Sequence, residues 1–208
     1  TTGSDMTGQG SISLPFKTIS HAIQMSNEYD TVYVNSGTYE EEYIYIYKRI
    51  ALIGQNRENT LIIGNSDFHP LVSFHPMNNQ NHYGGVYNHS LLKGFTITNL
   101  SETGRGVSTR VNCDSLIIQN NGYYGYTSAD NLIENSIIRN NGFNSNDPTI
   151  SDNNYGVNLL SGGAEIKNCL LQSDDYAFTA HNNTIENSTI IGDIFIPDWE
   201  FQLSINNS

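Results

Sequence analysis

Residues 117–122 read Ile-Ile-Gln-Asn-Asn-Gly, and residues 137–142 read Ile-Ile-Arg-Asn-Asn-Gly. Fainter copies of this strand-and-turn unit begin near residues 96, 170 and 190. A repeat of about 20 residues that combines short apolar strands with polar turns is typical of a solenoid. One unit cannot bury its own apolar face, so the units are expected to stack around a shared core. The equivalent core positions, 21, 20, 33 and 20 residues apart, are Ile97, Ile118, Ile138, Leu171 and Ile191.

A second motif within the same period predicts another strand. It joins a residue of variable size, a small residue and an apolar residue, as in Arg105-Gly106-Val107. The small residue suits a tight bend, and the alternation over residues 107–111 indicates a strand with one inward and one outward face. Beyond residue 27 no window has sustained helical spacing, and the regular Leu pattern of leucine-rich repeats is missing. The sequence therefore predicts an all-β solenoid.

The composition limits the class of partner. The formal net charge is −12, from 9 Lys+Arg against 21 Asp+Glu, and charged residues make up only 14% of the chain. A nucleic acid partner would require a basic stripe, so none is expected. No apolar run approaches the roughly 18 residues of a membrane-spanning helix, so no membrane span is expected. A mostly neutral, polar surface of Asn, Ser, Thr, Gln and Tyr suits hydrogen bonding and stacking with sugars, or the stacking of turns.

The N-terminal third differs from the repeats. Residues 15–26 place Phe16, Ile19, Ala22 and Ile23 on one helical face, and Pro15 fits a first helical turn. Because the first turn of a solenoid exposes an apolar end and an unpaired edge, this short amphipathic helix is predicted to cap it. Strand-like segments follow at residues 31–34, 43–47, 50–54 and 60–63.

The order of four N-terminal segments resembles a known superfamily. They read Pro-Phe-Lys-Thr-Ile at 15–19, Asp-Thr-Val-Tyr-Val at 30–34, Gly-Thr-Tyr-Glu-Glu at 37–41 and Ile-Ala-Leu-Ile-Gly at 50–54. This order is similar to the opening of right-handed parallel β-helix proteins of the pectin-lyase-like superfamily. The resemblance implies one right-handed parallel β-helix domain over residues 1–208, with roughly seven to eight turns and an N-terminal capping α-helix. It implies less about function, because this fold carries lyases, hydrolases, epimerases, phage tailspikes and adhesins.

The end of the chain suggests that the solenoid continues. Residues 185–188 read Ile-Glu-Asn-Ser and lead into a strand, and residues 205–208 read Ile-Asn-Asn-Ser. We therefore expect a truncated C-terminal end without a cap. Such an open edge would allow end-to-end self-association with another chain. Its apolar residues are predicted to be Ile194, Phe195, Phe201 and Ile205.

Two outward columns supply candidate substrate-binding residues. The first column could be a saccharide-stacking platform or a ladder that only stabilises a corner. It consists of the first residue of each bend motif: Gly84, Arg105, Tyr124, Tyr155 and Tyr176. The second column, which could support proton transfer or be a scatter of surface residues, holds His89, Arg110, Ala129, Leu160 and His181. The candidates are Arg105, Tyr124, Tyr155, Tyr176, His89, Arg110 and His181.

Acidic residues raise the question of an enzyme. Asp174-Asp175 follows a strand, as in polygalacturonase-type β-helices, but the Asn-Thr-Asp, Gly-His-Gly and Arg-x-Lys motifs of those enzymes are missing. Pectate-lyase-type relatives use an Asp cluster for calcium and a basic residue as the base. Candidate calcium ligands are Asp114, Asp130, Asp152, Asp174 and Asp175, and candidate bases are Arg105, Arg110 and Arg139. The aspartates do not converge on one column, so no catalytic residue is assigned and no cofactor is expected, with calcium left open.

Two further groups are interpreted as structural. Asn99, Asn120 and Asn140 share a register that Ser173 and Asp193 continue, which predicts an amide ladder that satisfies buried backbone groups. Residues 40–42 are all Glu and are expected to be solvated.

Taken together, the patterns favour a secreted or surface module that binds polysaccharide through a Tyr-rich lateral face. One alternative is a polysaccharide lyase or glycoside hydrolase that acts on acidic glycans. Another is a structural repeat of an adhesin or tail fibre.

Overall fold

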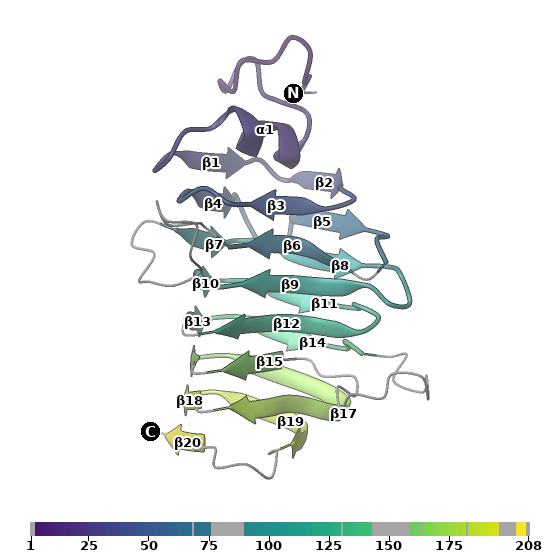
Figure 1. Cartoon of the computed structure of the whole chain (residues 1–208), viewed down its shortest axis with the longest axis vertical. Coiled ribbons are helices and arrows are strands. Elements are labelled where there is room, and N and C mark those ends of the chain that lie inside the picture. The colour runs from purple at the N-terminus through teal and green to yellow at the C-terminus, as the bar shows by residue number, and fades with distance from the viewer. Residues whose placement is uncertain are drawn as a thin grey trace.

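The chain winds into a parallel β-helix, in which short strands stack turn upon turn from the N-terminus to the C-terminus (Figure 1). This computed structural model describes residues 3–67, 69–75, 90–129, 131–142, 159–162, 164–181, 183–195 and 203–206. The strands form an 8-stranded sheet and a 12-stranded sheet. The second sheet bends through the long strand β17, so each full turn has three faces. The fold predicted from the repeat is thereby confirmed.

The first face is the 8-stranded sheet. Its strands are β1 (Thr31–Val34), β4 (Ala51–Gly54), β7 (Leu91–Lys93), β10 (Asn112–Asp114), β13 (Leu132–Glu134), β16 (Glu165–Lys167), β18 (Asn183–Glu186) and β20 (Leu203–Asn206). The second face consists of β2 (Gly37–Glu40), β5 (Thr60–Gly64), β8 (Thr96–Asn99), β11 (Ile117–Gln119), β14 (Ile137–Arg139), the start of β17 (Leu170–His181) and β19 (Thr189–Phe195). The third face consists of β3 (Ile44–Ile46), β6 (Pro70–Phe74), β9 (Arg105–Thr109), β12 (Tyr124–Ala129), β15 (Leu159–Gly162) and the end of β17.

The predicted core column is present, with one correction in the last turn. Ile118 pairs with Ile97 and Ile138, Ile138 pairs with Leu171, and all four side chains are buried. Leu171 then pairs with Ile190. Ile191, which was predicted to be buried, is 49% exposed.

The pairing of Leu171 with Ile190 agrees with the position of a serine that lies two residues before the core residue. Ser136 Oγ accepts the backbone N–H of Leu116, and Ser188 Oγ accepts that of Cys169. The two serines therefore occupy equivalent positions, and the core residue follows each of them by two. The step from Leu171 to its partner Ile190 is thus 19 residues instead of 20.

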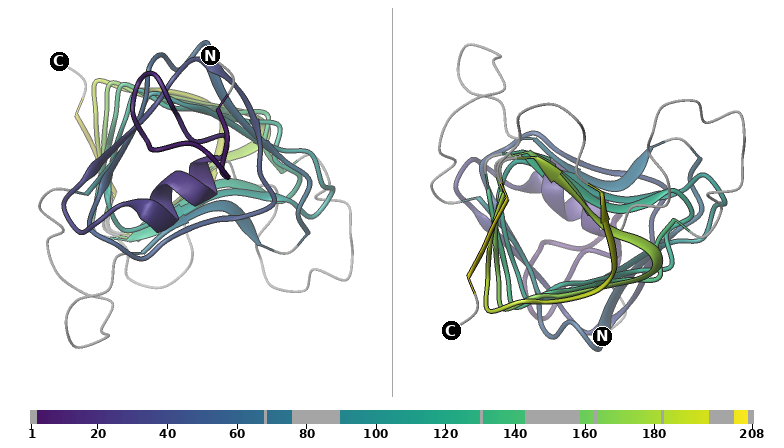
Figure 2. Two further views of the ribbon diagram at one scale, coloured as in Figure 1. Left: turned by 90° about the horizontal axis from the view of Figure 1, so that it is seen from above. Right: turned by 90° about the horizontal axis from the view of Figure 1, so that it is seen from below.

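The N-terminal cap is a helix, but it is shorter than the predicted 15–26. Helix α1 (Ile19–Met25) begins after Thr18, which has an extended backbone and whose side-chain oxygen accepts the N–H of His21. Residues 15–17 therefore precede the helix. Ile19 and Ile23 are buried against the first turn, and α1 lies across the open end of the coil (Figure 2). Lys48 Nζ caps the other end by donating to the carbonyls of three residues: Ile23, Gln24 and Ser26.

The expectation that residues 40–42 are all solvated is wrong for Glu41, which is only 8% exposed. Its carboxylate accepts the backbone N–H of Ile19 at 2.7 Å and the hydroxyl of Ser20 at 2.6 Å. A carboxylate at this position satisfies a free N–H of the first helical turn and joins the helix to β2. Glu41 is therefore part of the cap, whereas its neighbours Glu40 and Glu42 are exposed.

Replacing Glu41 by Gln should lower the free energy of unfolding by about 1–3 kcal/mol, because charge-assisted hydrogen bonds to buried donors are lost. Urea denaturation of the two proteins would measure the difference. Glu40→Gln, on the adjacent exposed residue, is the matched control and should change little. Equal losses in the two variants would contradict the assigned role of Glu41.

The amide ladder exists and includes Asn99 as predicted, but its next two members lie one residue later than predicted. Asn99, Asn121 and Asn141 are buried, and each side-chain oxygen of Asn121 and Asn141 accepts the backbone N–H one turn earlier, at 2.7 and 3.0 Å. Asn120 and Asn140 instead adopt left-handed backbone conformations, with φ of 56° and 52°. This turn directs the following side chain inward. The side chains of Ser173 and Asp193 lie outside the described part.

The C-terminal expectation concerns β20, which pairs with β18 at the end of the first face. Ile205 on this strand is 48% exposed. Residue 201 and the side chain of Phe195 lie outside the described part. The open end and its self-association stay predictions. In the part of the chain that the structure describes, no helix has the length and hydropathy needed to span a bilayer.

Candidate functional site

Two predicted binding residues, Arg105 and Tyr124, come together at the start of β9 and β12. They are paired in register, and the Arg105 guanidinium lies over the rings of Tyr123 and Tyr124 at 5.2 and 5.5 Å. Arg105 and Tyr124 each lie two residues before a fully buried residue of the same strand, Val107 or Tyr126, and therefore on the same side of the sheet. Burial raises the pKa of the Tyr124 hydroxyl, and the charge of Arg105 partly opposes this. These residues form a packed corner cluster: Arg105, Tyr123 and Tyr124.

The side chains of the other members of the predicted tyrosine ladder fall outside the part that the structure describes. Tyr155 lies outside the described residues, as does the side chain of Tyr176 on β17. Tyr126 pairs with Leu159, which is 33 residues later, whereas the predicted ladder requires an offset of 31 residues between these two strands. The pairing of these described residues differs by two from the register of the predicted ladder. The inserted segment before β15 lengthens this turn, and no local motif in the sequence fixes by how much.

The second predicted column also changes its members. Ala129 pairs with Gly162, and Gly162 pairs with His181, so Leu160 does not belong to that column. His89 lies outside the described residues, as does the side chain of His181. Strand β9 pairs with β6, not with a strand from residues 84–89. Next to Arg110 the structure therefore places His75.

An aromatic strip that the sequence analysis missed lies on the third face. Tyr43, Tyr45 and Tyr47 project from β3 and its flanks, and they are 40%, 37% and 46% exposed. Their ring centroids are 5.9 Å and 6.1 Å apart along the strand. The Tyr-Ile alternation of residues 43–47 could have predicted this strip, because period-two alternation places every second side chain on the same face.

Hydroxyl side chains continue from the strip across the neighbouring turns. Tyr45 pairs with Ser73, Ser73 with Ser108, and Ser108 with Thr127. These residues form what we call the hydroxyl row: Ser73, Ser108 and Thr127. The row runs parallel to the helix axis, so adjacent members are separated by the strand spacing of about 4.8 Å.

A histidine and an arginine accompany the hydroxyl row. His75 Nε2 lies 3.0 Å from Ser108 Oγ, and both side chains are partly buried. Burial lowers the pKa of the His75 imidazole, and the positive charge of Arg110 lowers it further. The imidazole is therefore neutral at neutral pH. The uncharged ring can donate a hydrogen bond to the Ser108 hydroxyl or accept one from it.

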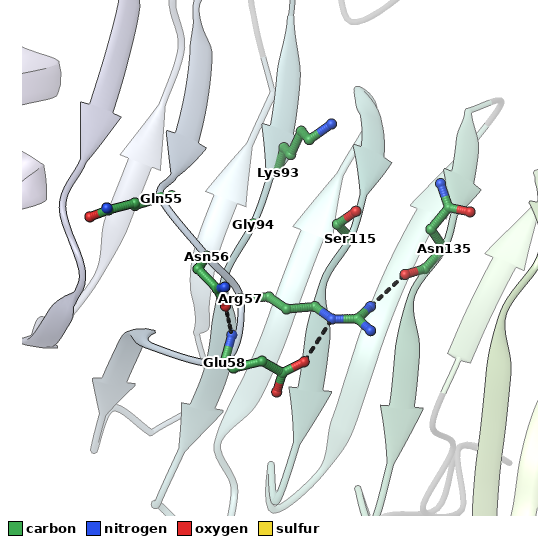
Figure 3. Close-up of a pocket in the computed structure, with 9 residues that line it drawn as sticks. Gln55, Asn56, Arg57, Glu58, Lys93, Gly94, Ser115 and Asn135 are labelled. Carbon is green, nitrogen blue, oxygen red and sulfur yellow. Dashed lines mark hydrogen bonds and ion pairs between the residues drawn. The ribbon is translucent and has the colours of Figure 1, made fainter.

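A separate pocket of about 440 Å³ lies at the corner between the first and second faces (Figure 3). Arg57 reaches across it, pairing with Glu58 at 3.0 Å and donating to the carbonyl of Asn135 at 2.6 Å. Lys93 pairs with Asp114 at 2.6 Å. The remaining lining residues are Gly54, Gln55, Asn56, Gly94 and Ser115.

The charges of this corner pocket are compensated from within. Burial acts to raise the pKa of Asp114, but bonds from Lys93, Asn135 and Ser115 outweigh it, and the pKa is lowered. Gly94, Ser115 and Asn135 all have left-handed backbones, with φ of 80°, 54° and 51°. We therefore interpret the pocket as a structural feature: it is lined by tight turns of successive coils, which these hydrogen bonds and ion pairs stabilise.

Of the five candidate calcium ligands suggested by the sequence, only the side chain of Asp114 lies in the described ranges. Asp114 is engaged as above. Asp130 and Asp152, and the side chains of Asp174 and Asp175, lie outside the described part. Among the described residues no group of three or more His, Cys, Asp or Glu side chains is arranged to hold a metal ion.

The sequence model of one protein family, described as "Protein of unknown function (DUF1565)", matches residues 1–196. The chain belongs to this family. Among solved structures, it is similar to the crystal structure of a pectin methylesterase mutant in complex with a hexasaccharide, with 13% sequence identity and a TM-score of 0.39. The match covers 88% of this chain and 54% of the other, so the chain spans about half of that protein's length. No curated protein sequence matches the chain significantly.

Proposed function

We propose that the third face binds polysaccharide, with Tyr43, Tyr45 and Tyr47 as the stacking surface. The observation that carries the proposal is the even spacing of three exposed rings, 5.9 Å and 6.1 Å apart. Aromatic faces pack against the C–H faces of sugar rings while their hydroxyls hydrogen-bond. A sugar polymer is regular along its length, so successive rings can each add a modest contribution.

The polar residues beside the strip supply the hydrogen bonds that a saccharide requires. Within the hydroxyl row, the partly buried Ser108 and Thr127 offer donors and acceptors toward neutral sugar hydroxyls. Arg110 adds a cation suited to a carboxylate-bearing sugar. This proposal replaces the predicted ladder of Tyr124, Tyr155 and Tyr176 with β3, and it gives Arg105 and Tyr124 a packing role. It includes an extracellular or cell-surface location, where polysaccharide is available to such a face.

Replacing Tyr45 by Ala should weaken polysaccharide binding roughly 2- to 10-fold, the value of one aromatic stacking contact. The melting temperature should change little, because the ring is not in the core. Affinity electrophoresis against a panel of neutral and acidic polysaccharides would measure binding, and thermal denaturation would measure stability.

Tyr33→Ala is the matched control, because Tyr33 is 76% exposed on β1 of the first face. It should leave binding unchanged. If Tyr45→Ala and Tyr33→Ala behave alike, or if no polysaccharide of the panel binds the wild type, the third face is not a saccharide surface.

A further inference from the structure

Three side chains from two adjacent turns meet on the third face in an arrangement that saccharide binding alone does not require. Ser108 is held in β9 between the parallel strands β6 and β12. His75 follows β6 and its Nε2 lies 3.0 Å from Ser108 Oγ. Arg110 is two residues beyond Ser108, so it lies on the same side of the sheet.

We propose that Ser108, His75 and Arg110 form a hydrolytic site for acyl esters. Ser108 is the nucleophile, His75 is the general base and then the general acid, and Arg110 stabilises the negative charge of the tetrahedral intermediate. A serine becomes nucleophilic when an adjacent base lies within hydrogen-bond reach, and 3.0 Å meets that requirement.

The protonation state of His75 agrees with this role. Burial and the charge of Arg110 both lower the pKa of the imidazole, so its neutral form predominates at neutral pH. A neutral ring that accepts the Ser108 hydroxyl proton at Nε2 carries its own proton on Nδ1.

The reaction balances with water as the second reactant. The Ser108 oxygen bonds to the ester carbonyl carbon while its proton passes to His75 Nε2, and the carbonyl oxygen becomes the oxyanion that faces Arg110. Collapse of this intermediate breaks the bond to the alcohol oxygen, which takes the proton from His75. Water then attacks the acyl-serine with His75 again as base, which releases the carboxylic acid and restores the Ser108 hydroxyl.

The surroundings of the site suggest the class of ester. Ser108 lies two turns from Tyr45 in the line of residues that begins with that tyrosine. A small acyl group on a hydroxyl of a bound sugar chain could therefore reach Ser108 while the sugar ring stacks on the strip. The predicted substrate class is an O-acylated carbohydrate. The hydrolytic step itself does not rest on polysaccharide binding, since a small free ester would also reach the serine.

The test uses the purified full chain with p-nitrophenyl acetate and with an acid-stable fluorophosphonate probe for activated serines. The wild type should hydrolyse the ester and be labelled at Ser108, as determined by peptide mass spectrometry. Ser108→Ala should abolish labelling and reduce hydrolysis to the uncatalysed rate. His75→Gln should lower hydrolysis about 10²- to 10⁴-fold, the usual contribution of a positioned acid–base group. Ser204→Ala, on an exposed serine of β20 on the first face, should leave both signals unchanged.

Three outcomes would overturn the proposal: no hydrolysis above the rate of Ser108→Ala, labelling only at another serine, or full activity in His75→Gln. The pH profile adds a readout that a structural role would not affect. Hydrolysis should be lost as the pH falls through a value below the ordinary histidine pKa of about 6.5, because the protonated ring cannot accept the serine proton. Thermal denaturation of each variant establishes that it is folded, and polysaccharide binding measured in parallel separates failure of this site from failure of the strip.

Discussion

Replacing Ile138 by Ala is expected to lower the free energy of unfolding by about 2–5 kcal/mol, as for other fully buried aliphatic residues. Ile138 has no exposed surface and pairs with Ile118 in one neighbouring turn and Leu171 in the other. In a solenoid each turn is stabilised mainly by its two neighbours. A cavity at this position therefore weakens both interfaces. Urea denaturation, followed by far-ultraviolet circular dichroism, would measure the loss.

Ile191→Ala is the matched control for this substitution. The sequence repeat treats Ile138 and Ile191 as equivalent, but Ile191 is 49% exposed. The control should change stability by less than about 0.5 kcal/mol, the usual range for surface substitutions. Similar losses in the two variants would show that Ile191, and not Ile190, faces the core.

The architecture could be predicted from the sequence because the core residues of a β-helix recur at regular intervals along the chain. Each turn must place an apolar side chain under that of the preceding turn, so Ile97, Ile118 and Ile138 recur at nearly constant steps. In the last turn the pair Ile190-Ile191 offers two choices of register. Aligning Ser188 with Ser136 resolves the choice, but this depends on a hydrogen bond that the apolar pattern does not report.

The candidate site was harder to predict because it depends on which strands are neighbours on the third face. Residues 84–86 read Gly-Gly-Val and resemble the bend motif, whereas Pro70-Leu71-Val72 does not. Strand β9 nevertheless pairs with β6, which brings His75 to Ser108. Insertions between turns break the constant step, so contacts between turns cannot be read from spacing alone. Within one strand spacing is reliable, and the Tyr-Ile alternation of residues 43–47 does predict the aromatic strip.

The amide ladder gives the second prediction of large effect. Asn121 Oδ1 accepts the backbone N–H of Asn99 at 2.7 Å, and its Nδ2 donates to Asn141 Oδ1 at 2.7 Å and to the carbonyl of Gln119 at 3.1 Å. Replacing Asn121 by Ala removes these bonds inside the coil. Each buried polar group left unpaired costs about 1–3 kcal/mol, so we expect a total loss of about 2–4 kcal/mol.

Asn120→Gly is the control that separates the observed ladder from the predicted one. Asn120 is exposed and has a φ of 56°, a conformation that Gly adopts without strain, so this variant should keep its stability within about 0.5 kcal/mol. Urea denaturation midpoints of the two variants would decide between the alternatives. A large loss at Asn120 with little change at Asn121 would support the sequence-based register. The opposite result is expected. The left-handed residue at each of these turns directs the next side chain into the coil. There, only a side-chain amide can both accept a hydrogen bond from one turn and donate one to the next.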